Sequence, residues 1–177
     1  MSLLQFGETG QVGLDLQRLM GADAPFMVLG RNRADLSDPE ACAAIIRDAR
    51  PAVVINVAGL HDEARAEADE DYARMVNATA PGAMAKACAE VGAPFVHLST
   101  ADVFDGSSDA PWKSTDRPRP VNALGRAKLA GERAIVSAGG AHVILRTSWI
   151  ISAHGDNFLR RILHRAAKGA PIEVPGD

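Results

Sequence analysis

Short apolar runs alternate with longer helical stretches along this chain of 177 residues, and this alternation restricts its fold more than any other feature. Several runs are apolar on both faces, as expected of parallel strands that helices cover on two sides. The expected strands are residues 2–6, 26–30, 52–57, 94–98 and 142–147. Strands and helices that alternate in this way build βαβ units. The sequence therefore predicts an α/β fold with a doubly wound parallel sheet, similar to the Rossmann fold.

Capping residues, glycine and proline predict where the helices begin and end. Residues 38–40, Asp-Pro-Glu, predict a helix start, with an Asp cap, a proline at the first position and an acid at the positive end of the helix. Residues 122–140 read as a helix that closes on two glycines. Pro81 lies within the helical stretch 69–91 and predicts a kink or a break there. Residues 105–120 are rich in Ser, Asp and Pro and predict a surface loop.

Composition excludes several classes of protein and partner. Apolar residues make up 47% of the chain and charged residues 23%, which is typical of a soluble globular protein. A net charge of −3 argues against nucleic acid or an anionic membrane as a partner. The first ten residues have neither the basic region nor the apolar run of a signal peptide, so a cytoplasmic protein is expected. Cys42 and Cys88 read as buried, reduced thiols, and no metal-ligand motif occurs, so no metal site is expected.

A glycine-rich stretch, GETGQVG, follows the first expected strand and opens a helix. Its glycines are Gly7, Gly10 and Gly13. Such glycines allow a tight turn, close approach of the backbone to a pyrophosphate, and close packing of helix on strand. The free N–H groups at the helix N-terminus would then face the phosphates. The stretch predicts a dinucleotide-binding site, with a purely structural turn as the alternative.

The residues after the second strand bear on which dinucleotide would bind. A site for NAD places an acid at the end of this strand, on the ribose hydroxyls. Here Arg31 and Arg33 follow Gly30, and the first acid is Asp35. Because an arginine suits a 2′-phosphate, we expect Arg31 to favour NADPH, with NADH as the alternative cofactor. In the other interpretation, Arg31 and Arg33 are solvated loop charges.

Seven stretches together resemble the dTDP-4-dehydrorhamnose reductase family of extended short-chain dehydrogenases, and they occur in the same order. They are FGETGQVG (6–13), RADLSDPEA (33–41), VVINVAG (53–59), VNATAPGAMA (76–85), HLSTADVFDG (97–106), NALGRAKLAGE (122–132) and LRTSWI (145–150). The resemblance implies reduction of the 4-keto group of a dTDP-4-keto-6-deoxysugar by NADPH or NADH, the last step towards dTDP-rhamnose. A sugar nucleotide is thus the expected substrate.

The resemblance also assigns cofactor contacts at the ends of the first three strands. In that pattern the glycine-rich stretch holds the pyrophosphate, the stretch after the second strand lies by the adenine, and the stretch after the third strand flanks the cofactor. The residues so assigned are Gly7, Gly10, Gln11, Val12, Gly13, Asp35, Leu36, Ala58 and Gly59.

Two residues are implied to act in catalysis and two in substrate binding. Thr100 would hydrogen-bond the substrate carbonyl, and Lys128 would bind the nicotinamide ribose. Asp102 and Trp149 are the expected substrate contacts. Each residue also has a plainer interpretation. Thr100 and Asp102 could only form a turn, Lys128 could be a solvated charge, and Trp149 could be core, as His97 is expected to be.

One departure from the family pattern concerns the proton donor. Leu124 stands four residues before Lys128, where the family has a tyrosine that protonates the reduced carbonyl. A leucine side chain can neither donate a proton nor accept a hydrogen bond. The single tyrosine, Tyr72, lies far away in the sequence. We therefore expect impaired catalysis, and the alternative is a non-catalytic dinucleotide-binding subunit with a regulatory or scaffolding role.

Two regions are expected from the same comparison with the family pattern. Residues 1–150 would form the NAD(P)-binding Rossmann domain, and residues 151–177 would be the start of a truncated substrate-binding region. Most of the C-terminal substrate domain would then be absent from this chain. A homodimer or a partner subunit could cover the apolar surface left open at Trp149 and Ile150.

Overall fold

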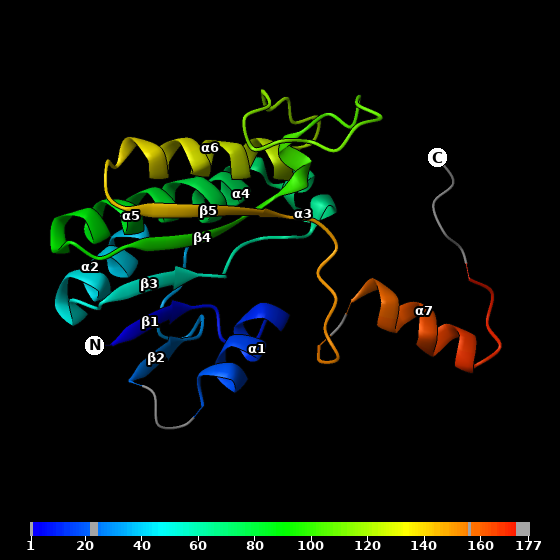
Figure 1. The fold of residues 1–177 in the computed structure, drawn as a ribbon, viewed down its shortest axis with the longest axis horizontal. Helices are drawn as coiled ribbons and strands as arrows, with labels where there is room; N and C mark the ends of the chain where they lie inside the picture. Colours follow the sequence, from blue (N-terminus) through cyan, green and yellow to red (C-terminus); the bar gives the residue numbers. More distant parts are fainter. Residues whose placement is uncertain (1, 22–24, 156, 173–177) are drawn as a thin grey trace.

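A computed structural model describes residues 2–21, 25–155 and 157–172 of the chain, and its centre is one parallel sheet (Figure 1). The five strands run in the order β2-β1-β3-β4-β5, and every pair of neighbours is parallel. They are β1 (Leu3–Phe6), β2 (Phe26–Leu29), β3 (Val53–Asn56), β4 (Phe95–Thr100) and β5 (His142–Thr147). All five predicted strands are confirmed, and so is the doubly wound α/β fold.

The helices lie on both faces of the sheet. The chain passes from β1 to β2 toward one edge through α1 (Gln11–Met20), and from β2 onward it returns toward the other edge. Connections between parallel strands of one sheet are right-handed, so a change in direction along the sheet moves the connecting helix to the other face. α1 therefore lies on the face opposite α2 (Pro39–Ala49), α5 (Ala80–Val91) and α6 (Ala123–Ser137). The last three pack side by side, α2 against α5 and α5 against α6. Figure 1 shows α5 and α6 along β4 and β5, with α1 apart from them.

The predicted cap at Asp38 is present, and Asn122 caps the start of α6 in the same way. The Asp38 carboxylate accepts a hydrogen bond from the amide of Ala41 (3.0 Å), and Pro39 is the first residue of α2. The Asn122 side chain accepts one from the amide of Gly125 (2.7 Å), at the start of α6. These bonds satisfy amide groups that the first helical turn leaves without partners. Both boundaries are thus fixed by local contacts.

The helical stretch before Pro81 changes its winding and is not broken at the proline, where a kink or a break was predicted. Short helices α3 (Glu63–Ala68) and α4 (Glu70–Arg74) lead into a π-helical segment at Met75–Thr79, and α5 then begins with Pro81 in its first turn. The amide of Ala80, the residue before Pro81, donates to the carbonyl of Met75 five residues back, so the π-helical segment leads directly into α5. The π-helical turn carries Asn77 inward, and its amide bonds both the N–H and the C=O of Leu60 (3.0 Å each).

The main core lies between the sheet and the α2, α5 and α6 layer. Leu4, Phe6 and Phe95 are among its fully buried side chains. Cys42 and Cys88 are buried and free, as predicted, and burial raises the pKa of their thiols to about 11 and about 12. The thiols are therefore structural and unreactive.

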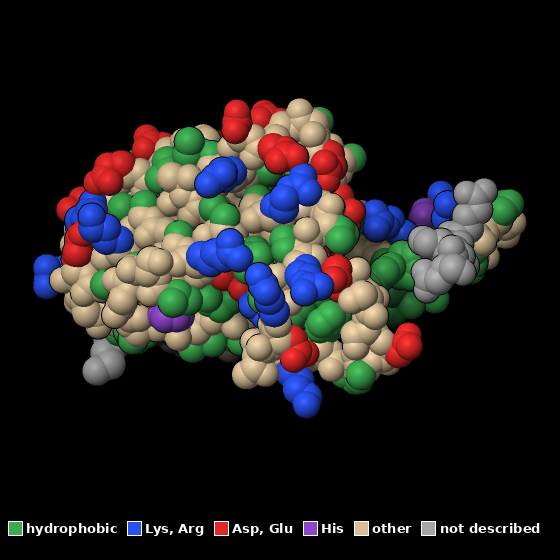
Figure 2. All heavy atoms as spheres, turned by 90° about the horizontal axis from the view of Figure 1, so that it is seen from above, with side chains coloured by type: hydrophobic (Ala, Val, Ile, Leu, Met, Phe, Trp, Pro, Cys, Tyr) green, Lys and Arg blue, Asp and Glu red, His purple; other side chains and the backbone are tan. Residues whose placement is uncertain are grey.

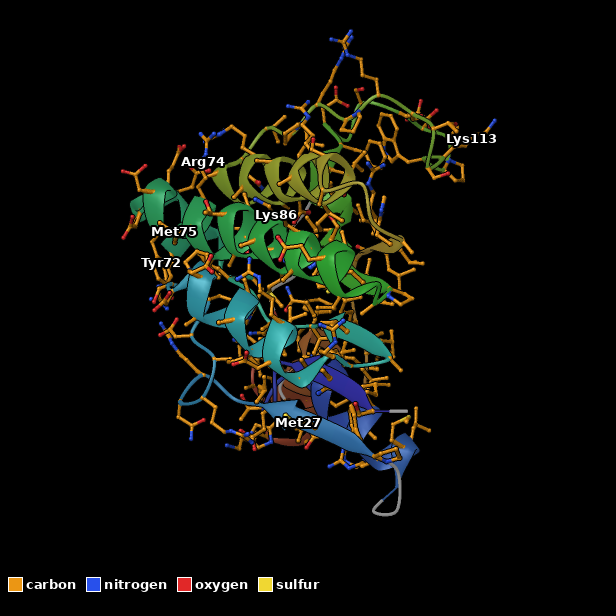
Figure 3. All side chains as sticks on the ribbon, turned by 90° about the vertical axis from the view of Figure 1, so that its left-hand side faces the viewer. Met27, Tyr72, Arg74, Met75, Lys86 and Lys113 are labelled. Atoms are coloured by element: carbon orange, nitrogen blue, oxygen red, sulfur yellow. The ribbon has the colours of Figure 1, made fainter. Side chains whose placement is uncertain are left out.

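Two segments extend away from this core. Residues 105–120 form a loop, as predicted, and Figure 3 shows Lys113 far out on it. After β5 the chain leaves the sheet and forms α7 (Phe158–Ala167), which has no buried residue and stands apart from the body in Figure 1. Figure 2 shows basic and acidic side chains mixed over the face seen from above, with α7 projecting at one side.

Candidate active site

The glycine-rich stretch forms a tight loop between β1 and α1. Gly7 has a φ of 103°, and a Cβ built on it would lie 2.9 Å from the amide nitrogen of Ala58. A Cβ on Gly13 would collide with the carbonyl oxygen of Gly7. Any other residue at these two positions would push the loop away from β3 or α1 away from β1. The predicted roles in a tight turn and in close helix–strand packing are confirmed for Gly7 and Gly13.

Gly10 leaves the start of α1 open to solvent. It is the N-cap residue of α1, no side chain caps the helix there, and nothing lies within 4 Å of a Cβ built on it. The backbone amides of the first turn are therefore open to an approaching group. A helix N-terminus with free amides and a bare glycine fits a pyrophosphate, because the amides and the helix dipole both favour negative charge.

The side chain of Gln5 holds this loop through hydrogen bonds, and sequence reasoning missed this residue. Its side chain is fully buried within β1, and its Nε2 donates to the carbonyl oxygens of Gly7 (2.7 Å) and Gly13 (3.1 Å). One amide thus ties the two ends of the loop together. The available signal was a glutamine in the middle of an apolar strand, where a buried polar group needs a partner.

Gln11, a predicted cofactor contact, has its side chain engaged by the segment that follows β5. Its Oε1 accepts a hydrogen bond from Nδ2 of Asn157 (2.9 Å). One turn further along α1, the Ser152 hydroxyl donates to the carboxylate of Asp15 (2.6 Å), and this bond lowers the pKa of Asp15. Residues 152 and 157 thus pack against the start of α1, and Asn157 occupies the acceptor oxygen of the Gln11 side chain.

A second polar cluster lies after β2. Arg31 donates through Nε to the carboxylate of Asp35 (3.1 Å) and through NH2 to the hydroxyl of Tyr72 (2.8 Å). The amide of Ser37 and the guanidinium of Arg31 lower the pKa of Asp35. Leu36 is buried in the main core, so Asp35 is the member of that pair that reaches solvent. Arg31 is exposed yet held in place.

Tyr72 contributes to this cluster and is not part of α6, the helix of Leu124 and Lys128. It lies on α4, and Figure 3 shows it at the end of the molecule that also carries the chain following β2. The guanidinium of Arg65 lies over its ring, 4.8 Å from the centroid. The hydroxyl of the single tyrosine is therefore engaged by Arg31 in the cluster after β2.

Lys128 is buried on α6, so its interpretation as a solvated charge is wrong. It is 9% exposed, and its Nζ donates to the carbonyl oxygen of Leu98 (3.3 Å) at the end of β4. A Cβ built on Gly59 would lie 3.0 Å from this Nζ and 2.8 Å from Oδ1 of Asn77. Burial lowers the pKa of Lys128 to about 8, against the opposing charge of Glu132. Gly59 and Lys128, each predicted as a cofactor contact, are therefore neighbours in the structure.

The carboxylate of Glu132, four residues after Lys128, organises the neighbouring strands. It accepts two hydrogen bonds from Arg146 of β5 (2.9 and 2.6 Å) and one from the hydroxyl of Ser99 of β4 (2.5 Å). A planar guanidinium matches a carboxylate in this paired arrangement. Neither residue was singled out from the sequence, because nothing local marks a glutamate and an arginine 14 residues apart as partners.

Thr100 and Asp102 form a closed pair. The Thr100 hydroxyl donates to the Asp102 carboxylate (2.8 Å) and accepts from the Asp102 amide (3.2 Å), capping a short 3-10 helix at Ala101–Val103. The plainer interpretation of these residues as turn formers is thus what the structure has. For Thr100 to donate to a substrate carbonyl, its proton would have to leave Asp102.

Leu124 and Trp149 lie in contrasting surroundings. Leu124 is 4% exposed and belongs to the main core, so the position of the expected acid is filled by packed aliphatic groups. Trp149 is 65% exposed and makes an edge contact with Phe158, with ring centroids 4.3 Å apart. The interpretation of Trp149 as a core residue is therefore wrong.

His97 is a core histidine, as expected. It is buried in β4, and its Nδ1 lies 3.1 Å from Nδ2 of Asn56. Since Oδ1 of Asn56 accepts from the amide of Ala58 (3.1 Å), Nδ2 must donate to His97, and the ring proton is on Nε2. Burial lowers the pKa of His97 to about 3, so the ring is neutral near neutral pH. Asn56 links this strand to the loop at Ala58.

Within the described ranges, no helix is long and apolar enough to cross a membrane. The same residues contain no group of three or more His, Cys, Asp or Glu side chains placed to hold a metal ion.

Sequence comparison connects this site to one family. The model of the RmlD substrate binding domain matches residues 1–177. The dTDP-4-dehydrorhamnose reductase of Burkholderia thailandensis is 41% identical over 177 residues, and that of Escherichia coli K12 is 38% identical over 181 residues. Each alignment covers this whole chain, which spans 59% and 60% of the length of those two relatives.

Comparison with solved structures points to the same family. A dTDP-4-dehydrorhamnose reductase from Clostridium acetobutylicum superimposes with a TM-score of 0.89 at 30% identity, over 95% of this chain and 60% of that one. The same enzyme from Bacillus anthracis, in complex with NADP, gives a TM-score of 0.89 at 26% identity, over 95% and 61%. By sequence and by fold, the chain belongs to the dTDP-4-dehydrorhamnose reductase family that the RmlD substrate binding domain defines.

Proposed function

We propose that this chain binds NADPH, with NADH as a second cofactor, and serves in the reduction of the 4-keto group of a dTDP-4-keto-6-deoxysugar. The observation that carries the proposal is a continuous line of contacts along the carboxyl edge of the sheet. Gly7 packs on Ala58, the next residue is Gly59, and Gly59 lies against Lys128. In doubly wound folds, ligands bind along this edge of the strands.

The parts of this edge correspond to the parts of a dinucleotide. The open amides around Gly10 suit the pyrophosphate, and Arg31 after β2 suits a 2′-phosphate. The buried ammonium of Lys128 suits the hydroxyls of the nicotinamide ribose. That a relative from Bacillus anthracis was solved in complex with NADP supports the same cofactor here.

The bound cofactor would supply a hydride to the carbonyl carbon, and the protein must then deliver a proton to the oxygen. Leu124 has no proton to give. Thr100 would hydrogen-bond the carbonyl oxygen after turning away from Asp102, and Thr100, Asp102 or water would be the proton source. A positioned acid is worth about 10²–10⁴ in rate, so turnover by this route would be slow.

We further propose that residues 1–150 are the cofactor-binding part and that residues 151–177 begin a region that contacts the sugar nucleotide. The exposed ring of Trp149 and the position of α7 away from the sheet support this division. Residues 156 and 173–177 lie outside the described part of the chain. A second copy or a partner subunit would cover apolar side chains near this boundary, such as Ile151 and Leu163.

A second function, a dinucleotide-binding subunit without catalysis, is favoured by one observation. Leu124 is packed in the core beside an intact Lys128, so the binding features persist where the acid does not. Both of the relatives reported above are named as dTDP-4-dehydrorhamnose reductases. Turnover of a sugar nucleotide by this chain would therefore favour the reductase over the non-catalytic subunit.

The test is a calorimetric titration of the purified chain with NADPH, followed by a turnover assay with a dTDP-4-keto-6-deoxysugar. Binding with measurable oxidation of NADPH supports the reductase. Binding without oxidation supports the non-catalytic subunit. If the folded chain binds neither NADPH nor NADH, both proposals are wrong.

A further inference from the structure

The side chain of Glu8 reaches from the glycine-rich loop to the end of β2. A Cβ built on Gly30 would collide with Oε2 of Glu8 and would lie 3.3 Å from its Cδ. The carboxylate therefore lies directly against the bare backbone of Gly30. This proximity follows from the sheet, because β1 and β2 are neighbours and the amide of Gly7 donates to the carbonyl of Leu29 (3.0 Å).

The end of the second strand is where an NAD site carries the acid that binds the ribose hydroxyls. The sequence places no acid on the strand end itself, and Asp35 is already bonded to Arg31 and to the amide of Ser37. Glu8 brings a carboxylate to this place from a different segment. Glu8 is exposed, and among the described residues no side chain forms an ion pair with it.

We propose that Glu8 determines which dinucleotide is preferred: its carboxylate accepts hydrogen bonds from the adenosine ribose hydroxyls and repels a 2′-phosphate. This inference rests on the proposed function. Arg31 acts in the opposite direction, since its guanidinium attracts a 2′-phosphate. Asp35 and Tyr72 hold Arg31 in place, so the affinity ratio of NADPH to NADH reflects a balance between Glu8 and Arg31.

The experiment is a pair of calorimetric titrations, with NADPH and with NADH, on the wild-type chain and on Glu8→Gln. The substitution keeps the shape of the side chain against Gly30 and removes one negative charge. We expect the affinity for NADPH to rise relative to that for NADH by about tenfold, the effect of one unit charge on a 2′-phosphate at a solvent-exposed site. The affinity for NADH should stay the same or fall.

The matched control is Asp48→Asn, which removes an equal charge from an exposed position near the end of α2. It should leave the affinity ratio unchanged, whereas Arg31→Gln should shift it toward NADH. An unchanged ratio in Glu8→Gln, or an equal change for both cofactors, overturns the role of Glu8 and leaves the proposed function standing. Failure of every variant to bind either cofactor overturns the proposed function itself.

Discussion

Leu124 and Lys128 lie one helical turn apart on the buried face of α6, with the leucine packed in the main core and the lysine bonded to the carbonyl of Leu98. Residues four apart on a helix are direct neighbours. An acid at position 124 would therefore stand beside the ammonium of Lys128. α6 thus carries the buried ammonium of Lys128 and, one turn before it, a hydrocarbon side chain where the family resemblance implies a tyrosine.

The first prediction is that Leu124→Tyr raises the rate of carbonyl reduction. A phenol beside Lys128 would supply the missing proton, and a positioned acid contributes about 10²–10⁴ in rate. The larger ring must fit a packed core, at a cost of about 1–3 kcal/mol in unfolding free energy. NADPH oxidation with a dTDP-4-keto-6-deoxysugar measures the gain, and circular dichroism confirms that the variant folds.

The control for this prediction is Leu124→Phe, which brings the ring without the hydroxyl. It should share the stability cost and show no gain in rate. An equal gain in the phenylalanine variant would mean that packing, and not a proton, is responsible. A folded tyrosine variant with no gain would count against the reductase proposal.

The second prediction separates two glycines of one loop. Gly10→Ala should lower the affinity for NADPH at least tenfold while changing the unfolding free energy by at most about 1 kcal/mol, because the new methyl group meets only open space at a helix cap. Gly13→Ala should lower both, since its methyl group would collide with the carbonyl of Gly7. Urea unfolding and calorimetry distinguish them. Equal loss of stability in the two variants would contradict the structure of the loop.

The third prediction concerns the buried ammonium of Lys128. Its pKa falls from an ordinary 10.5 to about 8, so between these pH values the unfolded chain binds more protons than the folded one. Unfolding free energy should therefore rise with pH across this window in the wild type and rise less in Lys128→Met. Lys86→Met, at an exposed position on α5 labelled in Figure 3, should keep the rise. Urea unfolding at several pH values measures it, and parallel pH profiles for all three proteins would refute the assignment.

The fourth prediction concerns acid. Burial lowers the pKa of His97 from 6.5 to about 3, so the unfolded state binds an extra proton between these values. This group contributes stability above pH 6.5 that is lost as the pH falls toward 3. His97→Gln, which can still accept from Asn56, should lose less stability on acidification, while His142→Gln, at an exposed site, should behave as the wild type. Acid-unfolding curves that coincide for wild type and His97→Gln would rule the effect out.

The fifth prediction concerns the ion pair between Glu132 and Arg146. Removing one partner of a buried pair costs about 3–5 kcal/mol, and the 23% exposure of the Arg146 side chain reduces this to about 2–4 kcal/mol for Glu132→Gln. Glu40→Gln breaks the exposed pair with Arg47 and should cost less than about 1 kcal/mol. Urea denaturation measures the unfolding free energy of both variants. Similar losses of stability would show that the buried pair stabilises the fold no more than the exposed one.

The fold and part of the site could be predicted from the sequence. The strands, the cap at Asp38 and the start of the helix near Asn122 all follow from interactions within a few residues, which a sequence displays directly. The turn at Gly7 was predictable for the same reason. The family resemblance singled out Lys128 as an expected cofactor contact. Seven stretches in a fixed order favour that interpretation over a solvated charge far more than one lysine on a helix does.

The sequence by itself determined the five strands and the doubly wound class of the fold, the glycine-rich loop and the presence of a leucine four residues before Lys128. Only the tertiary structure decided that Lys128 is buried against Leu98 and Gly59, that Tyr72 binds Arg31, and that Glu8 lies on Gly30. The physical reason is the range of the contacts. Caps and turns form between near neighbours, whereas these three contacts join segments that meet only after parallel strands align their ends at one edge of the sheet.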